Sequence, residues 1–345
     1  YGGAGAGSAY VISGPVSGEL SLSVAVSRLD GEVAGDQAGY SVAGPGDVDG
    51  DGLADILVGA FENDDNGAAS GAVYLFEGPV TGNYRLWAAD ARILGELPGD
   101  QAGWALSAGG DVNGDGLADL FMGAPNAHAD GVYTGAAYLV LGAPRGTFDL
   151  TEADAKLKGA NAGDLAGYAV AGGGDVDGDG YDDLVVGAPE ADLGGSASGA
   201  AYIVHGPVSG RVVLTAADTV LVGENTDDQA GASVAVSPDV DGDGLADLLI
   251  GARLDDTNGS NAGAAYIVRA VTTGTIDLGA QAGKVLGEAQ GDWAGAAVAG
   301  VGDLNNDGFG DMAVGVPFYD ISPDATERDA GAVWLMMGGG WPVVP

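Results

Sequence analysis

The sequence predicts an all-β fold, a β-propeller of four-stranded antiparallel blades, and three observations support this prediction. A unit of 64 residues recurs five times in the 345-residue chain. Each unit contains four short apolar runs between turn-forming residues, which is typical of strands. No segment keeps a 3.6-residue apolar period, so helix should be nearly absent. A unit of this kind cannot bury its faces alone and stacks on copies of itself, as propeller blades do. A linear β-solenoid, whose coils are usually shorter, is the competing architecture.

The repeat is defined by phrases that return at a constant spacing. The segment Asp47-Val-Asp-Gly-Asp-Gly-Leu-Ala-Asp55 starts again at Asp111, Asp175, Asp239 and Asp303. Single aspartates in phrases such as Gly-Asp-Gln-Ala-Gly keep the same register: Asp36, Asp100, Asp164, Asp228 and Asp292. So do the glycines that open a further short phrase: Gly18, Gly82, Gly146, Gly210 and Gly274. Chance does not produce agreement of this length.

The third unit illustrates the strands that we expect in each blade. Its four runs are bounded by Gly, Pro and Asp and comprise Tyr168–Ala171, Asp183–Ala188, Ala200–Val204 and Arg211–Leu214. Several runs are apolar on both faces, as expected of strands that lie between neighbouring sheets. Tyr40, Trp104 and Tyr168 begin the first run of their units. We expect them to line the core or the central channel rather than to bind a cofactor.

We expect a single domain over residues 1–345, with repeats at about 24–87, 88–151, 152–215, 216–279 and 280–340. Residues 1–23 carry a third-strand phrase around Tyr10 and a fourth-strand phrase, Glu19–Leu22. The last repeat ends on a third-strand phrase, Gly331–Leu335. The N-terminal segment can therefore supply the missing fourth strand and close a ring of five blades. One third-strand phrase is then left over, either as an extra edge strand or as part of a longer ring.

Composition excludes several classes of function. The 11 Lys and Arg residues against 50 Asp and Glu give a net charge of −39, which rules out nucleic-acid binding through phosphates and electrostatic attachment to anionic membranes. No apolar run is long enough to insert into a membrane as a helix. Without cysteine there is no disulfide, thiolate metal site or cysteine nucleophile. A hydrophobic content of 46% still allows a sizeable core. The chain begins with Tyr1 and shows no signal peptide, so we expect a processed or trimmed product.

The acidic nonapeptide Asp-x-[Asp/Asn]-x-Asp-Gly-x-x-Asp predicts about five Ca²⁺ ions, one per repeat. Oxygen ligands at alternate positions, with glycine at the sharp turn of position six, are what a calcium loop requires, and magnesium would keep more of its waters. A single copy would fit an ordinary acidic turn equally well, but five copies favour the metal. The ligands would be the side chains at positions one, three, five and nine and the carbonyl at position seven. They are Asp47, Asp49, Asp51, Leu53 and Asp55; Asp111, Asn113, Asp115, Leu117 and Asp119; Asp175, Asp177, Asp179, Tyr181 and Asp183; Asp239, Asp241, Asp243, Leu245 and Asp247; and Asp303, Asn305, Asp307, Phe309 and Asp311. Because Asn113 and Asn305 each remove one negative charge, we expect their loops to bind more weakly.

These phrases resemble the FG-GAP repeat of integrin α-subunit β-propellers and their bacterial relatives. The acidic loop runs into phrases such as Asp183-Leu-Val-Val-Gly-Ala-Pro189, and Ala-Gly-Tyr-Ser-Val-Ala-Gly44 lies upstream of the first loop. The resemblance covers essentially the whole chain. The Phe of the Phe-Gly pair, however, is alanine in all five copies: Ala38, Ala102, Ala166, Ala230 and Ala294. Phe61 and Arg253 replace the proline of Gly-Ala-Pro. Integrin rings have seven blades, whereas five full units are visible here.

The resemblance implies a calcium-stabilised extracellular recognition domain. In such propellers the calcium loop joins strands one and two on one face of the ring, and partners meet loops on the opposite face. The loops between strands two and three are also the least alike in this sequence. They include 61–66, 126–133, 253–257 and the expanded 318–323. Their exposed aromatics and arginine favour an interface on that face, although loops also diverge without function.

No catalytic constellation is evident. His128 and His205 do not recur in the repeat, and we expect them to be surface or packing residues. There is no nucleophile elbow, zinc-binding His-Glu-x-x-His or phosphate-binding loop. Paired carboxylates are so abundant that they do not discriminate a glycosidase-like site. We expect the Asp36-type residues to hydrogen-bond a turn rather than to act as bases.

The sequence therefore favours a non-enzymatic, calcium-binding propeller that is secreted or displayed on the cell surface and mediates adhesion or recognition of a protein or glycan. One alternative is a propeller module of an extracellular enzyme that acts on polysaccharide or lipid. Another is a structural unit of a surface layer or fibre, which associates with copies of itself through its terminal strands.

Overall fold

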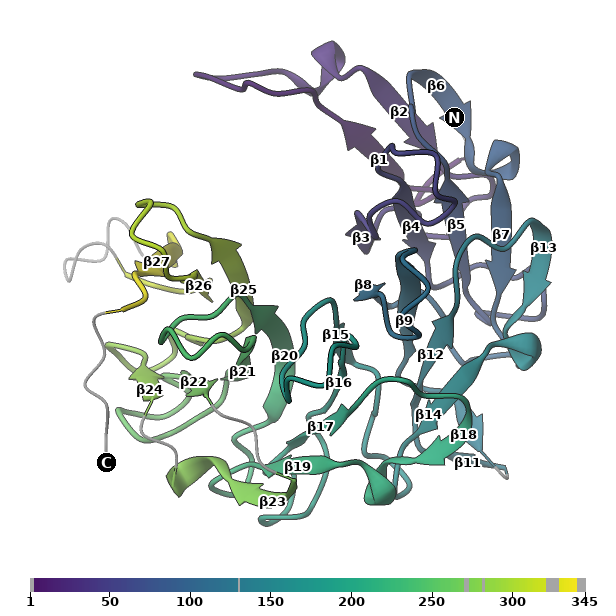
Figure 1. Ribbon diagram of the computed structural model, residues 1–345. Coiled ribbons are helices and arrows are strands. Elements are labelled where there is room, and N and C mark those ends of the chain that lie inside the picture. Colours follow the sequence, from purple (N-terminus) through teal and green to yellow (C-terminus); the bar gives the residue numbers. More distant parts are fainter. Residues whose placement is uncertain (1–2, 130, 270–272, 281–282, 321–328, 340–345) are drawn as a thin grey trace.

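The computed structural model describes residues 3–129, 131–269, 273–280, 283–320 and 329–339. In these residues the strands form six sheets of three to five strands and one two-stranded hairpin, and the helices are single 3-10 turns. Figure 1 shows the six sheets arranged as the blades of an open arc, with the N-terminal and C-terminal blades at its two ends. The all-β propeller architecture predicted from the sequence is confirmed.

Three five-stranded blades form the middle of the arc. Their first strands lie at the inner side, where those of neighbouring blades contact one another (Figure 1). From the inner to the outer edge, the first of these blades contains β3 (Val42–Ala43), β4 (Ile56–Ala60), β5 (Ala72–Phe76), β7 (Ala91–Leu94) and β13 (Gly146–Asp149). The second contains β8 (Ala105–Gly110), β9 (Asp119–Ala124), β12 (Ala136–Val140), β14 (Ala155–Lys158) and β18 (Gly210–Val213). The third contains β15 (Ala169–Ala171), β16 (Leu184–Ala188), β17 (Ala200–Val204), β19 (Thr219–Val222) and β23 (Gly274–Asp277).

The outermost strand of each of these blades corrects the strand assignment made from the sequence. The pattern assigns Arg211–Leu214 as the fourth strand of the third unit. In the structure β18 instead pairs in parallel with β14 of the preceding blade, and the antiparallel fourth strand is β19. Both runs are short and apolar, so the pattern alone does not separate them. Their roles are decided by the sheet edge that each one meets.

A 3-10 turn follows each outer strand and helps to attach the repeat to the blade before it. The turns that follow an outer strand are Leu86–Ala88, Leu150–Glu152, Leu214–Ala216 and Leu278–Ala280, and an equivalent turn, Leu22–Val24, lies in the N-terminal segment without an outer strand before it. The leucine that begins a turn is at most 1% exposed in four cases: Leu86, Leu150, Leu214 and Leu278. Leu22, which has no preceding blade among the described residues, is 53% exposed. The outer strand and its leucine therefore act together as a link between blades.

The blades towards the ends have fewer strands. A four-stranded blade contains β20 (Ala230–Ser237), β21 (Asp247–Ala252), β22 (Ala264–Val268) and β24 (Gly283–Leu286). The C-terminal blade contains β25 (Ala297–Gly302), β26 (Asp311–Val316) and β27 (Ala332–Met336). The N-terminal one contains β1 (Ser8–Val11), β2 (Ser27–Asp30) and β6 (Gly82–Arg85). A small hairpin, β10 (His128–Ala129) and β11 (Val132–Tyr133), projects between β9 and β12.

The expected closure of a five-bladed ring does not occur among the described residues. β1 pairs with β2, and β2 with β6, while β27 pairs with β26 alone. The fourth strand of the N-terminal unit is thus β2 rather than the phrase Glu19–Leu22. Because β1 and β2 are consecutive third and fourth strands, they pair with each other as their equivalents do in every complete blade. Within the described part of the chain, the edges of β1 and β27 remain open.

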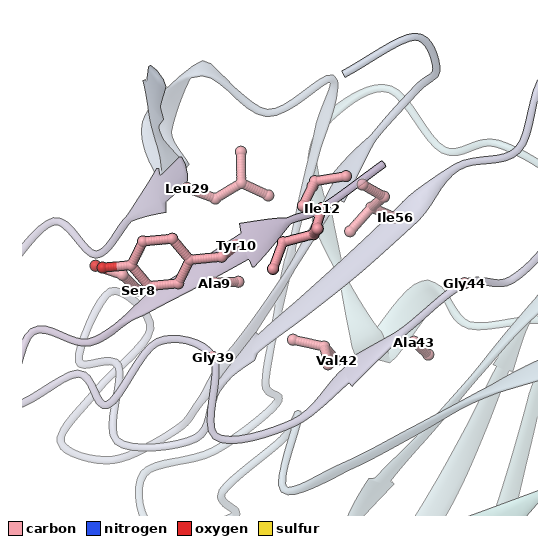
Figure 2. A pocket seen from close by; sticks show the side chains of 11 residues that line it. Ser8, Ala9, Tyr10, Ile12, Leu29, Gly39, Val42, Ala43, Gly44 and Ile56 are labelled. Atoms are coloured by element: carbon pink, nitrogen blue, oxygen red, sulfur yellow. The ribbon is translucent and has the colours of Figure 1, made fainter. Parts of the chain in front are cut away.

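The open edge of β1 borders an apolar groove. In the complete blades the second strand pairs at this edge. Here a groove of about 580 Å³ lies between β1 and β3. Figure 2 shows Tyr10 and Ile12 of the N-terminal segment with Val42 and Ile56 around it. Tyr10 is 40% exposed and Ile12 38%, so the groove presents apolar side chains to solvent.

The core lies between blades rather than within one. In the four blades between the two terminal ones, strands two and three are buried on both faces, so the side chains of one blade pack against those of the next, and each of the larger apolar clusters joins two blades. The backbones approach so closely that a side chain at the glycine of Gly-Ala-Pro would not fit. A Cβ at Gly187 would lie 2.1 Å from the carbonyl oxygen of Gly231 in the following blade. The Gly-Ala phrase is therefore a packing requirement.

This close approach predicts that Gly187→Ala destabilises the protein by about 1–3 kcal/mol, the usual cost of overpacking. Gly44→Ala is the matched control, because its Cβ would have its nearest contact at 3.9 Å. Urea unfolding in the presence of calcium would measure both. Equal stability of the two variants would contradict the packing argument.

Candidate metal centre

Each acidic loop joins the first and second strands of a blade, and its first aspartate fixes the turn. In the first loop, between β3 and β4, Asp47 Oδ1 accepts hydrogen bonds from the backbone N–H groups of Gly50 at 2.8 Å and Asp51 at 3.1 Å, and Oδ2 from Gly52 at 2.8 Å. Gly50 and Gly52 have φ values of 78° and 89°, which favour glycine. Equivalent bonds to the loop backbone recur at Asp111, Asp175, Asp239 and Asp303.

The last aspartate of each loop is buried and ties three segments together. Asp55 Oδ2 accepts from the N–H of Val48 within the loop at 2.8 Å, and Oδ1 from the N–H of Gly78 after the third strand at 2.7 Å. Both contacts recur at Asp119, Asp183 and Asp311. Asp247 keeps the bond within the loop, while its Oδ1 has no partner among the described residues. All five side chains belong to residues that are at most 1% exposed.

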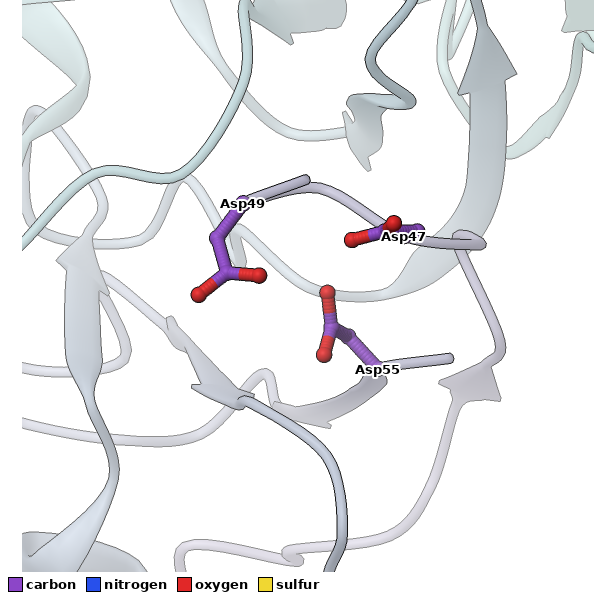
Figure 3. A group of neighbouring side chains, drawn as sticks. All are labelled: Asp47, Asp49 and Asp55. Carbon is purple, nitrogen blue, oxygen red and sulfur yellow. The ribbon is translucent and has the colours of Figure 1, made fainter. Parts of the chain in front are cut away.

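Carboxylates at positions one, three and nine converge in the three loops that have Asp at position three. One carboxylate oxygen of each residue lies within 4.8 Å of the others in each set: Asp47, Asp49 and Asp55; Asp175, Asp177 and Asp183; and Asp239, Asp241 and Asp247. Figure 3 shows the first set, with its three carboxyl groups around a common space. Three negative groups at this separation repel one another unless a cation lies between them, and hard oxygen ligands suit calcium.

Position five does not join these groups. Asp51 Oδ1 instead accepts a hydrogen bond from the N–H of Leu53 at 2.8 Å, and the same contact recurs at Asp115, Asp179, Asp243 and Asp307. In the two asparagine loops, Asn113 Nδ2 donates to Asp115 Oδ2 and Asn305 Nδ2 to Asp307 Oδ2, both at 2.9 Å. In the three loops with aspartate at position three, the structure therefore brings together three of the four side chains that the loop sequence suggests as ligands.

Burial makes the position-nine carboxylates costly to ionise without a metal. It raises the pKa of Asp119 and Asp183 to about 6 and that of Asp247 to about 7, against the opposing effect of backbone hydrogen bonds. At the mouth of the fourth loop the balance is reversed. Partial burial acts to raise the pKa of Asp239, but backbone N–H groups, led by that of Gly242, lower it below its usual value. The fourth loop thus combines a buried carboxyl whose pKa is raised, Asp247, with one whose pKa is lowered, Asp239.

A basic side chain lies beside each position-three aspartate, a feature that the loop sequence does not reveal. Asp49 Oδ2 is 3.4 Å from Arg145 Nη2, which lies in the segment between β12 of the second blade and β13, the outer strand of the first. Asp177 Oδ2 is 2.8 Å from His205 Nδ1, and Asp241 Oδ2 is 3.8 Å from Arg269 Nη1. No such base pairs with Asn113 or Asn305 among the described residues. At the first and fourth loops, the arginine therefore offsets part of the extra negative charge that an aspartate at position three adds.

A second set of bases connects neighbouring blades. Lys156 on β14 pairs with Glu96, which follows the fourth strand of the preceding blade. Lys284 on β24 lies 2.5 Å from Glu224 and 2.8 Å from Asp255. The signal was present in the sequence, because Arg28, Arg92, Lys156 and Lys284 share the 64-residue register. These pairs are structural rather than part of the metal loops.

The Asp36-type residues hydrogen-bond turns, as expected. Their carboxylates accept from the backbone N–H three residues earlier, in Val33, Leu97, Asn161, Asn225 and Ala289. The expected inner lining is also observed: the ring centroids of Tyr40 and Trp104 are 4.9 Å apart, and those of Trp104 and Tyr168 5.5 Å apart. Tyr40 is 51% exposed, so this stack lines the inner surface rather than the core.

The two histidines have different surroundings. His128 Nδ1 is 2.8 Å from Asp100 Oδ1, and its ring contacts that of Tyr133 with the centroids 3.9 Å apart and the planes tilted by 46°. His205 lies beside the third acidic loop, and its Nε2 is buried without a partner among the described residues. The variable loops between strands two and three lie on the face opposite to the acidic loops. The last of these, 318–323, lies outside the described residues from position 321 onwards.

Comparison with known proteins agrees with this architecture. The FG-GAP repeat model matches residues 38–76, 102–140, 166–204, 230–268 and 294–336, more than half of the chain. The chain is 36% identical over 177 residues to integrin alpha-PS2 of Drosophila melanogaster, covering 48% of the chain and 12% of that protein. It is 30% identical over 232 residues to integrin alpha pat-2 of Caenorhabditis elegans, covering 63% and 18%.

A relative with an enzyme name is also similar. The chain is 33% identical over 228 residues to phosphatidylinositol-glycan-specific phospholipase D of Bos taurus, covering 61% of the chain and 26% of that protein. In each of these three relatives the matched stretch makes up about a quarter or less of the full length. Among the described residues, no helix has the length and apolar character needed to cross a membrane.

The raised pKa values predict the pH dependence of stability after chelation. A carboxyl whose pKa is higher in the folded protein than its unfolded value of about 3.9 stabilises the fold fully below that value. The stabilisation is lost as pH rises through about 6 for Asp119 and Asp183 and about 7 for Asp247. The unfolding free energy in chelator should therefore fall by a few kcal/mol between about pH 4 and pH 8.

Excess calcium should reverse this trend, because the metal binds the ionised carboxylates. Urea unfolding across this pH range, with chelator and with calcium, would measure it. Asp247→Asn should make the unfolding free energy in chelator fall less between these pH values. This variant therefore distinguishes the effect of the loop carboxyl from the general charge repulsion within an acidic chain. An unfolding free energy that rises with pH in chelator would contradict the prediction.

The basic partners predict a change in metal affinity. Arg145→Ala removes a cation that competes with the metal for Asp49, so calcium affinity at the first loop should increase by about two- to fivefold, a modest factor because Arg145 is largely exposed to solvent. Site-resolved calcium titration by NMR would test this. Arg85→Ala, far from the acidic loops in sequence and without an ion pair among the described residues, is the control. Unchanged or weaker affinity at the first loop would show that Arg145 does not compete.

Proposed function

Because the chain belongs to the FG-GAP repeat family, we propose that it is a calcium-binding, extracellular or cell-surface β-propeller that mediates adhesion or recognition of a protein or glycan, without catalysis. The observation that carries this proposal is the convergence of three carboxylates in each of three loops, one of the three belonging to a buried aspartate. Integrin α-subunits, to which the chain is similar, give the adhesion class its support.

Calcium would act here as a structural ion. The side chains at positions one, three and nine would hold it, with the carbonyl at position seven and the position-five carboxylate, directly or through water, completing the shell. The ion would neutralise the buried carboxyl at the start of the second strand. This chain's own residues supply the rest: the loop backbone orients the first aspartate, and the N–H groups of the loop and of the third-strand turn orient the last. The loops with Asn113 and Asn305 would bind in the same manner with one carboxylate fewer.

Recognition would take place on the face opposite to the metal loops. The 2–3 loops differ most between repeats there, and they carry exposed aromatic side chains, including Tyr133 at 56% and Phe318 at 39% exposure. Calcium would contribute indirectly, because it fixes the strands from which these loops emerge. The net charge of −39 argues against nucleic acid as the partner.

The phospholipase relative supports an alternative function, in which this propeller is a module attached to an enzyme that acts on polysaccharide or lipid. No catalytic constellation lies in the described residues to support activity within the chain itself. The two proposals differ in what adjoins the propeller in the complete protein. An adjoining catalytic domain would favour the enzyme, and a stalk or anchor would favour the adhesin.

The open strand edges support a structural function as a second candidate. Among the residues that the structure describes, β1 lacks a second strand beside it and β27 lacks a fourth. Apolar residues on β27 such as Val333 and Leu335 are 67% and 53% exposed. One copy could therefore pair its β27 with a terminal strand of the next copy. Sedimentation at several protein concentrations would show assembly, and a monomer at all of them would exclude it.

The calcium function predicts that chelation lowers the melting temperature by about 10 °C or more. Ligands that bind only the folded state stabilise it by mass action, and several equivalent sites contribute. Differential scanning calorimetry with calcium, magnesium and chelator would measure the effect, with the largest stabilisation expected for calcium. The two variants Asp183→Asn and Asp164→Asn provide a matched comparison, because only the first changes a metal loop. An identical melting curve with calcium and with chelator would defeat the proposal.

A further inference from the structure

A pocket at the outer part of the second blade gathers basic side chains in a chain that has few of them. Lys156, Lys158 and Arg211 are three of only 11 Lys and Arg residues, and they line one pocket of about 430 Å³. His128, one of two histidines, lies in the same lining. The remaining lining residues are Glu96, Leu97, Val212 and Val213.

The sheet register places these bases together. Lys156 and Lys158 are two residues apart on β14, so they project from the same face of the strand. The parallel pairing of β18 with β14 sets Arg211 opposite Lys156. The pocket therefore exists because the outer strand of the third repeat is added to the second blade, a pairing that the sequence pattern did not indicate.

Two of the three bases depart from the repeat. Where the second blade has Lys158, the other units have Asp30, Leu94, Val222 and Leu286. Where β18 has Arg211, the equivalent outer strands have Asn83, Thr147 and Thr275. Lys156 belongs instead to the repeated Arg28 register and pairs with Glu96. Since other blades are built without bases at the Lys158 and Arg211 positions, packing does not require them.

The charges in the pocket leave one guanidinium without a counter-ion. Lys156 is paired with Glu96, and His128 Nδ1 lies 2.8 Å from Asp100 Oδ1. Arg211 is exposed and makes no hydrogen bond or ion pair with any described residue. A guanidinium presents a fixed fork of N–H donors that matches a carboxylate or sulfate group. The pocket is thus suited to an oxyanion.

We propose that this pocket binds one carboxylate- or sulfate-bearing sugar residue, with Arg211 as the main contact and Lys158 as a second cation. The proposal deepens the recognition function by naming the chemistry of the ligand. A volume of about 430 Å³ falls in the usual range for small-ligand pockets. Tyr133, whose ring contacts that of His128 and which is 56% exposed, adds an apolar ring beside the pocket. Long polyanions and acidic peptides are disfavoured, because the rest of the chain repels them.

Calorimetric titration of the calcium-loaded chain with methyl glucuronoside, glucose 6-sulfate and methyl glucoside tests the proposal. Both charged sugars should bind saturably at millimolar concentration and at least tenfold more tightly than the neutral one. Added salt should weaken the binding of both charged sugars. No saturable binding of either charged sugar, equal binding of the neutral sugar, or tighter binding of an acidic peptide would overturn it.

Variants taken from the protein's own repeats provide the controls. Arg211→Thr and Lys158→Leu install the residues found at equivalent positions in other units. Each substitution should weaken the binding of the charged sugars at least tenfold. Arg85→Thr, on the outer strand β6 of another blade, should leave the affinity for the charged sugars unchanged. Melting temperature and calcium response are measured for each variant, and Arg211→Thr alone, which changes one exposed side chain, decides the outcome if Lys158→Leu misfolds. Sugar binding without any calcium response would sustain this inference while removing the proposed calcium function.

Discussion

A buried carboxylate at the start of every second strand is the interaction on which the rest of each blade depends. Through its two oxygens, an aspartate such as Asp55 holds both the acidic loop and the turn after the third strand. Burial makes that charge expensive unless a cation or proton compensates it. The same carboxylate thus holds the loop and the turn in place and creates the need for a metal ion. The geometry of the strands and that of the metal site are therefore linked at one side chain.

Contacts between blades follow from the apolar faces that the strands of a single blade would leave exposed to solvent. Strands two and three are apolar on both faces, so a blade is stable only against its neighbours. Two features make that packing specific: glycines such as Gly187, where the next backbone approaches, and the outer strand that each repeat adds to the blade before it. At the N-terminal blade the inner strands are absent among the described residues, and the apolar groove beside Tyr10 is the direct consequence.

The few bases in this acidic chain are concentrated at defined places. Arg145, His205 and Arg269 lie beside position-three aspartates, and Lys156 and Lys284 link neighbouring blades. Lys158 and Arg211 fit neither pattern and meet in one pocket. In a repeat protein, a residue that leaves the register is not needed to build the unit. Departures from the repeat are therefore as informative as the repeat itself.

The sequence by itself determined the all-β propeller class, the 64-residue unit, the position of the acidic loops between the first two strands and the structural role of the Asp36-type residues, because these depend on local turn chemistry and on a period that five copies make unmistakable. Only the tertiary structure decided which apolar run is the fourth strand, that residues such as Arg211 belong to the preceding blade, and that β1 and β2 pair together rather than closing the ring. It also decided which loop carboxylates converge and which bases accompany them. These features depend on which sheet edge meets which strand, and an edge is defined by the packing of several repeats rather than by any one of them.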